Sequence, residues 1–334
     1  MDYNGVLLLV KDTPGMTMSA KYEQVVGEAL YSTMPTGTLD IMLMNTPGTL
    51  RQLEKIVSDL YAIARRQAEI NDRQKVRVTV LLDGHDIEYG RPQKWEAITA
   101  GAPELPLTLD FRRLIPPENP MILGVPVVLL KMDDDFLYTS TAPTPSNRST
   151  KSLDAISEDL ESLNLDQASH PVVCLGGTFD HLHDGHKILL TIAGYIALEK
   201  LIVGVTGPEL LKNKKYAEAM ESYEFRKETV EGFLSYVFPS LQVEAVMISD
   251  IYGPTAHIPD IQALVVSKET QSGGNSVNEL RRSKGFPELK VFAIDVVGGK
   301  NSNEQNNWEG KMSSTEYRKL ELEAREKERE REKL

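Results

Sequence analysis

The sequence has little cysteine and no long apolar run, which excludes several protein classes. Cys174 is the only cysteine in 334 residues, so neither an intramolecular disulfide nor a thiolate zinc site can form. It lies in the run VVCLGG, where a thiol is expected to be buried and unreactive. No apolar run approaches the roughly 20 residues that cross a bilayer, and no basic segment precedes the N-terminal apolar run. We therefore expect a cytoplasmic protein.

Basic side chains are fewer than acidic ones in this sequence. The chain has 37 Lys and Arg against 49 Asp and Glu, a net charge of -12. Because nucleic-acid backbones are bound mainly by clustered Lys and Arg, this balance argues against nucleic acid as a general partner, while allowing a local basic pocket. Hydrophobic residues make up 41% and charged residues 26%, as is usual in globular proteins.

The length and one polar segment predict two domains. Residues 139–169 are rich in Ser, Thr, Pro and Asp and poor in large apolar side chains, so we expect a linker there. We expect an N-terminal α/β accessory domain in 1–138 and a second α/β domain in 170–320. Residues 321–334 are mostly Glu, Lys and Arg without an apolar stripe, which is typical of a solvated helical tail.

Both halves alternate strand-like runs with helix-like periodicity. In the first half these runs are 5–10, 39–44, 76–82 and 125–131, and the segment LDGHD (82–86) is expected to be only a turn. In the second half they are 172–176, 201–205, 243–248, 263–266 and 291–297. The second pattern predicts a doubly wound parallel sheet, Rossmann-like, with ligands beyond the carboxyl ends of its strands.

The stretch GGTFDHLHDGH (176–186) follows the first strand of that sheet and holds three of the six histidines. Gly176 and Gly177 allow a sharp turn and close approach of a ligand. The next helix is expected to begin near His183, where free amides and the helix dipole favour phosphate. The histidines could be metal ligands, structural hydrogen bonders or donors to phosphate. The absence of a nearby cysteine weighs against the metal.

A second segment, GKMSSTEYR (310–318), supports the phosphate interpretation. Its lysine, three hydroxyls and arginine surround the expected start of another helix, with a serine as N-cap. Serines before a helix are usually only a cap. Paired with the 176–186 stretch, however, they predict a two-sided grip on a nucleoside triphosphate.

These motifs resemble those of a known family. HDGH (183–186) is similar to the HxGH signature of the nucleotidyltransferase superfamily, and SSTEYR (313–318) to its SSTxxR element. With ELLKNKK (209–215) and SDIYGPT (249–255), residues 171–320 resemble phosphopantetheine adenylyltransferases of the eukaryotic and archaeal type. The resemblance implies transfer of AMP from ATP to 4'-phosphopantetheine, giving dephospho-coenzyme A and pyrophosphate in coenzyme A biosynthesis.

The resemblance also implies residue roles. His186 and Lys212 would be catalytic, with Lys214 or Lys215 as substitutes for Lys212. Residues expected to bind ATP, which would arrive with Mg²⁺, are Gly177, Thr178, Phe179, His183, His186, Lys311, Ser313, Ser314, Thr315 and Arg318. Residues expected to contact the second substrate are Thr178, Lys212, Tyr252, Lys268, Asn278 and Arg281. His181 is expected to be structural, and no metal ligands are expected in the protein.

The expected reaction is a direct in-line attack of one phosphate on another, without a covalent intermediate. It needs alignment and neutralisation of charge, which cations, helix N-termini and Mg²⁺ supply. Alternatives are a transferase for nicotinamide nucleotide or cytidylyl substrates, a class I aminoacyl-tRNA synthetase, and a scaffold of coenzyme A enzymes with a relic transferase domain. Residues 1–138 could contact other enzymes of that pathway. Because no GxxxxGKS loop occurs, dephospho-coenzyme A kinase activity is expected on another protein.

Overall fold

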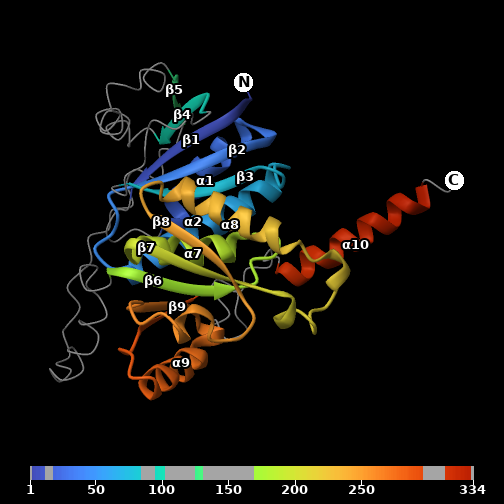
Figure 1. The fold of residues 1–334 in the computed structure, drawn as a ribbon. Helices are drawn as coiled ribbons and strands as arrows, with labels where there is room; N and C mark the ends of the chain where they lie inside the picture. The colour runs from blue at the N-terminus through green and yellow to red at the C-terminus, as the bar shows by residue number, and fades with distance from the viewer. Residues whose placement is uncertain are drawn as a thin grey trace, which may run out of the picture. The chain divides into compact units, whose positions relative to one another are not determined.

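The computed structural model describes residues 2–11, 18–83, 95–101, 125–130, 169–295 and 313–331. The chain divides into two compact units, Met1–Ala168 and Ser169–Leu334, each with its own parallel sheet (Figure 1). Of the predicted linker, only Ser169 lies within the described residues. Within the described ranges, no helix is both long and apolar enough to cross a membrane.

The first unit is built on a five-stranded parallel sheet with the order β3-β2-β1-β4-β5. Its elements are β1 (Tyr3–Lys11), α1 (Met18–Tyr31), β2 (Thr33–Met44), α2 (Leu50–Ile70), β3 (Arg77–Leu82), β4 (Ala97–Gly101) and β5 (Val127–Leu130). The central strand β1 is fully buried from Val6 to Val10, because a parallel strand is covered on both faces. The four strands expected from the sequence are present, and β4 is an addition.

Helix α2 illustrates how the sequence directs this packing. Its N-cap Thr49 accepts a hydrogen bond from the Gln52 amide at 3.2 Å, which satisfies one of the free amides of the first turn. Buried Leu53, Val57 and Leu60 recur at steps of three and four residues, as on one helix face. The segment LDGHD lies outside the described residues from position 84 onward.

The second unit carries another five-stranded parallel sheet, in the order β10-β9-β6-β7-β8. Its strands are β6 (His170–Gly177), β7 (Ala197–Thr206), β8 (Gln242–Ile248), β9 (Ala263–Ser267) and β10 (Lys290–Ile294). The first strand, β6, is central, and the chain extends the sheet first toward β8 and then toward β10. The order therefore reverses at β6, where doubly wound proteins bind ligands beyond the carboxyl ends of the strands. The doubly wound prediction is confirmed.

Helices connect these strands. They are α7 (Asp184–Ile196), α8 (Tyr223–Val237) and α9 (Gln271–Ser283), and α10 (Ser314–Arg331) follows the sheet. Short 3-10 turns also occur: η3 (Pro208–Leu210), η4 (Ala217–Ala219), η5 (Gly253–Ala256) and η6 (Lys268–Thr270). Cys174 is buried in a core cluster with Ile202 and Leu264, and burial raises the pKa of its thiol to about 12 despite the opposing charge of Arg281. The thiol therefore stays protonated at neutral pH.

Two helical glycines give a matched test of packing in this unit. A Cβ at Gly194 in α7 would lie 2.3 Å from Cε2 of Phe238, whereas a Cβ at Gly232 in α8 would meet nothing within 4 Å. We expect Gly194→Ala to lower the free energy of unfolding by about 1–3 kcal/mol through overpacking. Gly232→Ala should instead raise it by up to about 1 kcal/mol. Urea denaturation of both variants measures the difference, and equal effects would contradict this packing.

Candidate active site

The turn between β6 and α7 has an unusual backbone. Phe179 and His181 both have positive φ, 52° and 48°, a conformation that costs a residue other than glycine about 1–3 kcal/mol. His183 is the N-cap of α7, and its side chain makes no capping hydrogen bond. The turn lies where the strand order reverses, with the N-terminus of α7 beside it. Such strain persists only where surrounding contacts hold the backbone in place.

Gly177 makes room for one of these contacts. A Cβ at this position would lie 2.9 Å from Cζ of Phe179, so a side chain would displace the Phe179 ring. That ring is fully buried and lies 5.4 Å from the ring of His186, centroid to centroid. The glycine therefore lets the strand end pack against the aromatic ring that supports His186.

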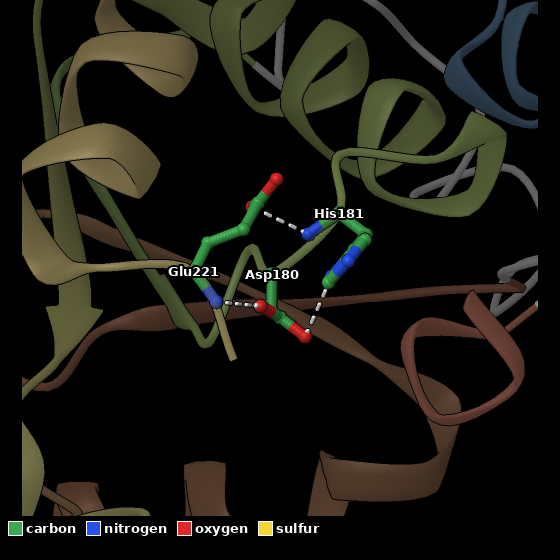
Figure 2. A group of neighbouring side chains, drawn as sticks. All are labelled: Asp180, His181 and Glu221. Carbon is green, nitrogen blue, oxygen red and sulfur yellow. Dashed lines mark hydrogen bonds and ion pairs between the residues drawn. The ribbon is translucent and has the colours of Figure 1, made fainter. Parts of the chain in front are cut away.

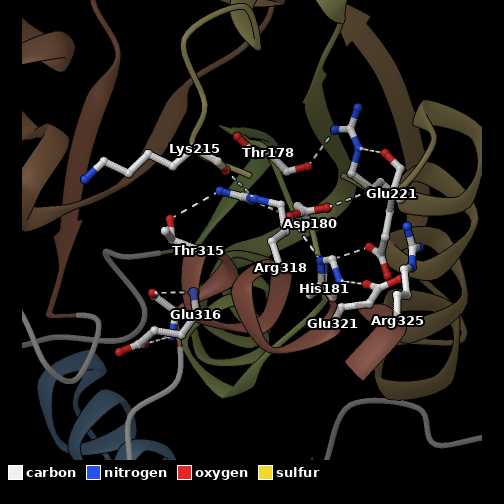
Figure 3. Close-up of polar contacts among 12 residues, drawn as sticks. Thr178, Asp180, His181, Lys215, Glu221, Thr315, Glu316, Arg318, Glu321 and Arg325 are labelled. Atoms are coloured by element: carbon white, nitrogen blue, oxygen red, sulfur yellow. Dashed lines mark hydrogen bonds and ion pairs between the residues drawn. The ribbon is translucent and has the colours of Figure 1, made fainter. Parts of the chain in front are cut away.

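A buried carboxylate holds the turn together (Figures 2 and 3). Asp180 is fully buried, and its Oδ1 accepts a hydrogen bond from the amide of Glu221 at 2.9 Å. The Glu221 carboxylate in return accepts from the amide of His181 at 2.7 Å. This exchange fixes the turn to the segment before α8 and supports the strained backbone at His181.

The other oxygen of Asp180 joins the turn to the C-terminal helix. Nη1 of Arg318 in α10 donates to Asp180 Oδ2. The same guanidinium donates through Nε to the carbonyl of Lys215 at 2.9 Å and through Nη2 to Thr315 Oγ1 at 3.2 Å. Arg318 is only 2% exposed, so its positive charge is compensated by the buried Asp180 carboxylate and does not face solvent. It thus links three segments of the candidate site.

A second buried arginine fastens the strand ends from the other side. Arg226 in α8 is 1% exposed, and its Nη1 donates to the carbonyl of Thr178 at 2.7 Å and Nη2 to that of Thr206 at 2.9 Å. Its Nε donates to the carbonyl of Glu221 at 3.2 Å. The carboxyl ends of β6 and β7 are therefore held to the segment before α8.

The first turn of α10 has a capping box. The Ser313 amide donates to Glu316 Oε2 at 2.6 Å, and the Glu316 amide donates to Ser313 Oγ at 3.4 Å. This reciprocal pair is a common helix start, and it confirms a serine as N-cap. The remaining first-turn amides, with the hydroxyls of Ser314 and Thr315 beside them, form the kind of helix N-terminus that binds anions.

Aromatic rings bring the two motifs together. Tyr317 of α10 lies nearly parallel to His181 and to His183, with centroid distances of 6.1 and 6.4 Å. His183 in turn stacks on His186 at 3.8 Å. The rings of the HDGH turn and of the SSTEYR segment therefore form one row. The two segments that were predicted to bind a nucleoside triphosphate together lie next to each other.

His181 connects the turn to α10 through its side chain. Its Nδ1 lies 3.1 Å from Asp180 Oδ2, and its Nε2 lies 2.8 Å from Glu321 Oε2 (Figure 3). Burial by itself lowers the pKa of His181, but the hydrogen bonds to Glu321 and Asp180 and the charges of Asp180 and Glu221 outweigh it and raise this pKa. The bond to His181 also lowers the pKa of Glu321. The imidazole thus lies between two carboxylates.

Asp180, His181 and Glu221 are also the one group in the described ranges whose ligand atoms could jointly hold a metal ion, all within 4.8 Å of one another. Each is already engaged: Asp180 by Arg318 and the Glu221 amide, His181 by Glu321, and Glu221 by the His181 amide. A guanidinium on the shared carboxylate also repels a cation. The arrangement is a network of charged hydrogen bonds, and it does not fit a resident metal.

The predicted lysine run lies beside this network. Lys212, Lys214 and Lys215 follow η3, and all three are exposed. The Lys215 carbonyl accepts from Arg318, which ties the run to α10. Lys311 lies outside the described residues. The structure thus brings together the 177–186 turn, the lysine run and the start of α10.

The structure gives two of the predicted substrate-binding side chains, Arg281 and Asn278, backbone partners. Arg281 is fully buried and donates all its hydrogen bonds to backbone carbonyls, those of Thr255, Ile258, Pro259, Ile261 and Pro287. Asn278 pairs with both backbone groups of Leu289. Leu289 and Ile261 precede β10 and β9, at the amino edge of the sheet. Helix α9 carries both side chains away from the carboxyl edge, so they hold loops in place.

The two other residues predicted to contact the second substrate, Lys268 and Tyr252, have different partners. Lys268 forms an exposed ion pair with Asp295 at 2.6 Å, and Tyr252 packs partly against the core cluster around Cys174. The tail predicted to begin at residue 321 is continuous with α10, and Glu321 belongs to the His181 contact.

Sequence reasoning missed four residues of the site: Asp180, Arg226, Tyr317 and Glu321. Asp180 and Tyr317 lie within the motifs and Glu321 lies next to one, whereas no local signal pointed to Arg226.

Comparison with known proteins defines the class of the second unit. Residues 174–320 match the family model described as cytidylyltransferase-like. This range begins in β6 and ends in α10, and so includes the candidate site except Glu321. The unit is a domain of the nucleotidyltransferase fold.

Individual relatives indicate which family of nucleotidyltransferases the chain belongs to. The phosphopantetheine adenylyltransferase of Saccharomyces cerevisiae is 46% identical over 167 residues, which are 50% of this chain and 53% of that protein. Proteins of the same name from Methanopyrus kandleri and Pyrococcus abyssi are 37% and 36% identical, over 78% and 80% of their lengths and 37% and 38% of this chain. The chain belongs to the phosphopantetheine adenylyltransferase family. It is matched over only about half the length of the yeast relative.

The buried ion pair predicts a large effect on stability. Arg318→Ala leaves the Asp180 carboxylate buried without its guanidinium, and we expect a loss of about 3 kcal/mol in the free energy of unfolding. Arg325→Ala removes an exposed i,i+4 pair with Glu321 on the same helix and should cost less than about 1 kcal/mol. Urea denaturation compares the two, and similar losses would show that the buried pair contributes little.

The raised pKa of His181 predicts a pH dependence. The stabilisation from protonated His181 is fully present below its ordinary pKa of 6.5 and is lost as the pH rises through the raised folded value. We expect the thermal midpoint of the wild type to exceed that of His181→Asn most near pH 6. The gap should narrow toward about pH 9. A gap that grows with pH would contradict a cationic His181.

Proposed function

We propose that the chain is a pantetheine-phosphate adenylyltransferase, which transfers AMP from ATP to 4'-phosphopantetheine and releases pyrophosphate. The observation that carries the proposal is the junction of the HDGH turn and the SSTEYR segment, made by the stacking of Tyr317 against His183 and by the Arg318–Asp180 ion pair. Family membership independently supports the same reaction.

The geometry suits binding of a triphosphate between two helix N-termini. Helix α7 begins at the strand-order reversal and α10 begins beside it, and both helix dipoles attract negative charge. Gly177 and the following amides would hold the phosphates on one side. Ser313, Ser314 and Thr315 would hold the β- and γ-phosphates on the other.

The stacked histidines would act at the α-phosphate. His183 makes no capping bond with its side chain, and its ring lies 3.8 Å from that of His186. In the proposed mechanism His186 donates to a non-bridging oxygen of the α-phosphate and stabilises the charge that develops there during attack. Because the attacking phosphate is already ionised, the reaction needs no protein nucleophile. Mg²⁺ would enter with ATP and neutralise the leaving pyrophosphate.

The exposed lysine run would position the second substrate. Lys212 is the proposed contact to the phosphate of 4'-phosphopantetheine, with Thr178 at the end of β6. The anchored carbonyl of Lys215 limits how far this run can move from α10. Alignment of the two substrates then supplies most of the rate acceleration.

Arg318 has a different place in this mechanism from the one its motif implied. Its guanidinium is engaged by Asp180, Thr315 and the Lys215 carbonyl. We propose that it supports the ATP site by holding the SST segment and the lysine run in place. A cytoplasmic location and contacts of residues 1–138 with other enzymes of coenzyme A synthesis remain predictions.

The assay is pyrophosphate release with ATP, Mg²⁺ and 4'-phosphopantetheine, run beside nicotinamide mononucleotide with ATP and a cytidylyl acceptor with CTP. We expect release only with 4'-phosphopantetheine. His186→Ala should lower kcat by about a hundredfold or more, since it removes a donor to the transition state. Its circular dichroism spectrum and thermal midpoint should stay close to those of the wild type. Preference for another acceptor, or a fully active His186→Ala, would refute the assignment.

A further inference from the structure

Helix α10 is attached to the HDGH turn at two points. The first is the Arg318–Asp180 ion pair, which belongs to the family motif. The second lies one helical turn further along, beyond the motif, where the Glu321 carboxylate meets His181 at 2.8 Å (Figure 3). We call this His181–Glu321 contact the clasp.

We propose that the clasp is a positioning device for ATP binding, which holds α10 in the place where its SST segment can contact the triphosphate. The inference rests on the proposed function for the identity of the ligand. Neither residue of the clasp is expected to touch ATP, so both are positioning residues. The first residue of the predicted solvated tail thus helps to position the nucleotide site without being part of it.

The surroundings of the clasp favour a charged contact. The turn contributes Asp180, and the segment before α8 contributes Glu221, whose carboxylate binds the His181 amide. From α10, Tyr317 stacks near the imidazole and Arg325 pairs with Glu321. Arg318 is occupied by Asp180 and does not compete for Glu321.

Exposure limits the strength of the clasp. The side chains of His181 and Glu321 are 14% and 37% exposed, so water weakens the attraction but does not abolish it. A contact of this kind changes an equilibrium severalfold. It biases the position of α10 while the buried Arg318 pair provides the main attachment.

This bias has a specific kinetic signature. If only a fraction of the free protein has α10 in place, the apparent ATP affinity falls by that fraction. Saturating ATP restores the position of α10 through its own contacts with the SST segment. Loss of the clasp should therefore raise the KM for ATP and leave kcat and the KM for 4'-phosphopantetheine nearly unchanged.

Helix α10 offers a matched control. Glu321→Ala removes the clasp together with an i,i+4 pair to Arg325, whereas Glu323→Ala removes a similar pair to Lys319 and no contact with the turn. Both substitutions exchange a glutamate for alanine in the same helix. Hydrogen exchange of the α10 amides in the full-length protein without ATP then reports on helix attachment independently of activity.

We expect Glu321→Ala to speed exchange of the amides in the first turns of α10 by about threefold to tenfold, and to raise the KM for ATP by a similar factor. Glu323→Ala should do neither. His181→Asn should resemble Glu321→Ala, and the double variant should add little, because each removes the same contact. The result does not depend on the folding of His181→Asn, since Glu321→Ala alters only a partly exposed residue.

The outcomes separate the clasp from the proposed function. If Glu321→Ala and Glu323→Ala have the same rates of hydrogen exchange in α10 and the same KM for ATP, the proposed role of the clasp is refuted, even if the enzyme is active. Additive effects in the double variant would refute it as well. If the wild type lacks adenylyltransferase activity, the proposed function fails. In that case ATP binding by calorimetry and the exchange comparison still decide whether the clasp holds α10 and supports nucleotide binding.

Discussion

The carboxylate of Asp180 is the interaction on which the candidate site depends. One of its oxygens binds the segment before α8 and the other binds Arg318 of α10. A fully buried carboxylate is costly unless it is paired and hydrogen-bonded, and here its partners come from segments that lie far apart in the sequence. Satisfying this single charge therefore brings together the pieces that bind nucleotide in the proposed mechanism. The left-handed backbone at Phe179 and His181 is tolerated because those pieces surround it.

The described part of the second unit uses its arginines and lysines differently. Arg226 and Arg281 are buried and donate to backbone carbonyls, while buried Arg318 donates to one carbonyl and to the side chains of Asp180 and Thr315. A guanidinium suits this use, because its five donors reach several carbonyls at once while the charge stays delocalised. The lysines of the 212–215 run are exposed instead. In an acidic chain this division leaves mobile cations for phosphate and keeps rigid ones for architecture.

The sequence predicted the elements whose signal is local. Strands β6 to β10 follow from apolar runs between helix-like segments, and the HDGH and SST motifs were placed at the strand end and helix start where they occur. Strand β4 was missed because AITAG is short and carries little apolar periodicity. The backbone contacts of Asn278 and Arg281 were not predicted, because a polar residue in a helix near a motif gives no indication of which sheet edge it will face. The pairings of Asp180 with Arg318 and of His181 with Glu321 each span about 140 residues, and no local pattern encodes them.

The long separation between Asp180 and Arg318 also has a consequence for synthesis on the ribosome. The central strand β6 emerges early and can pair with β7 as soon as α7 has formed. Asp180 leaves the ribosome with β6, but its guanidinium partner is made 138 residues later. Until then the carboxylate lacks its ion-pair partner, and the turn that carries the histidines is held only by its contacts with Glu221 and Arg226. A chain made only up to β10 can therefore build the sheet, but in the proposed mechanism it would lack one of the two helix N-termini that hold the triphosphate.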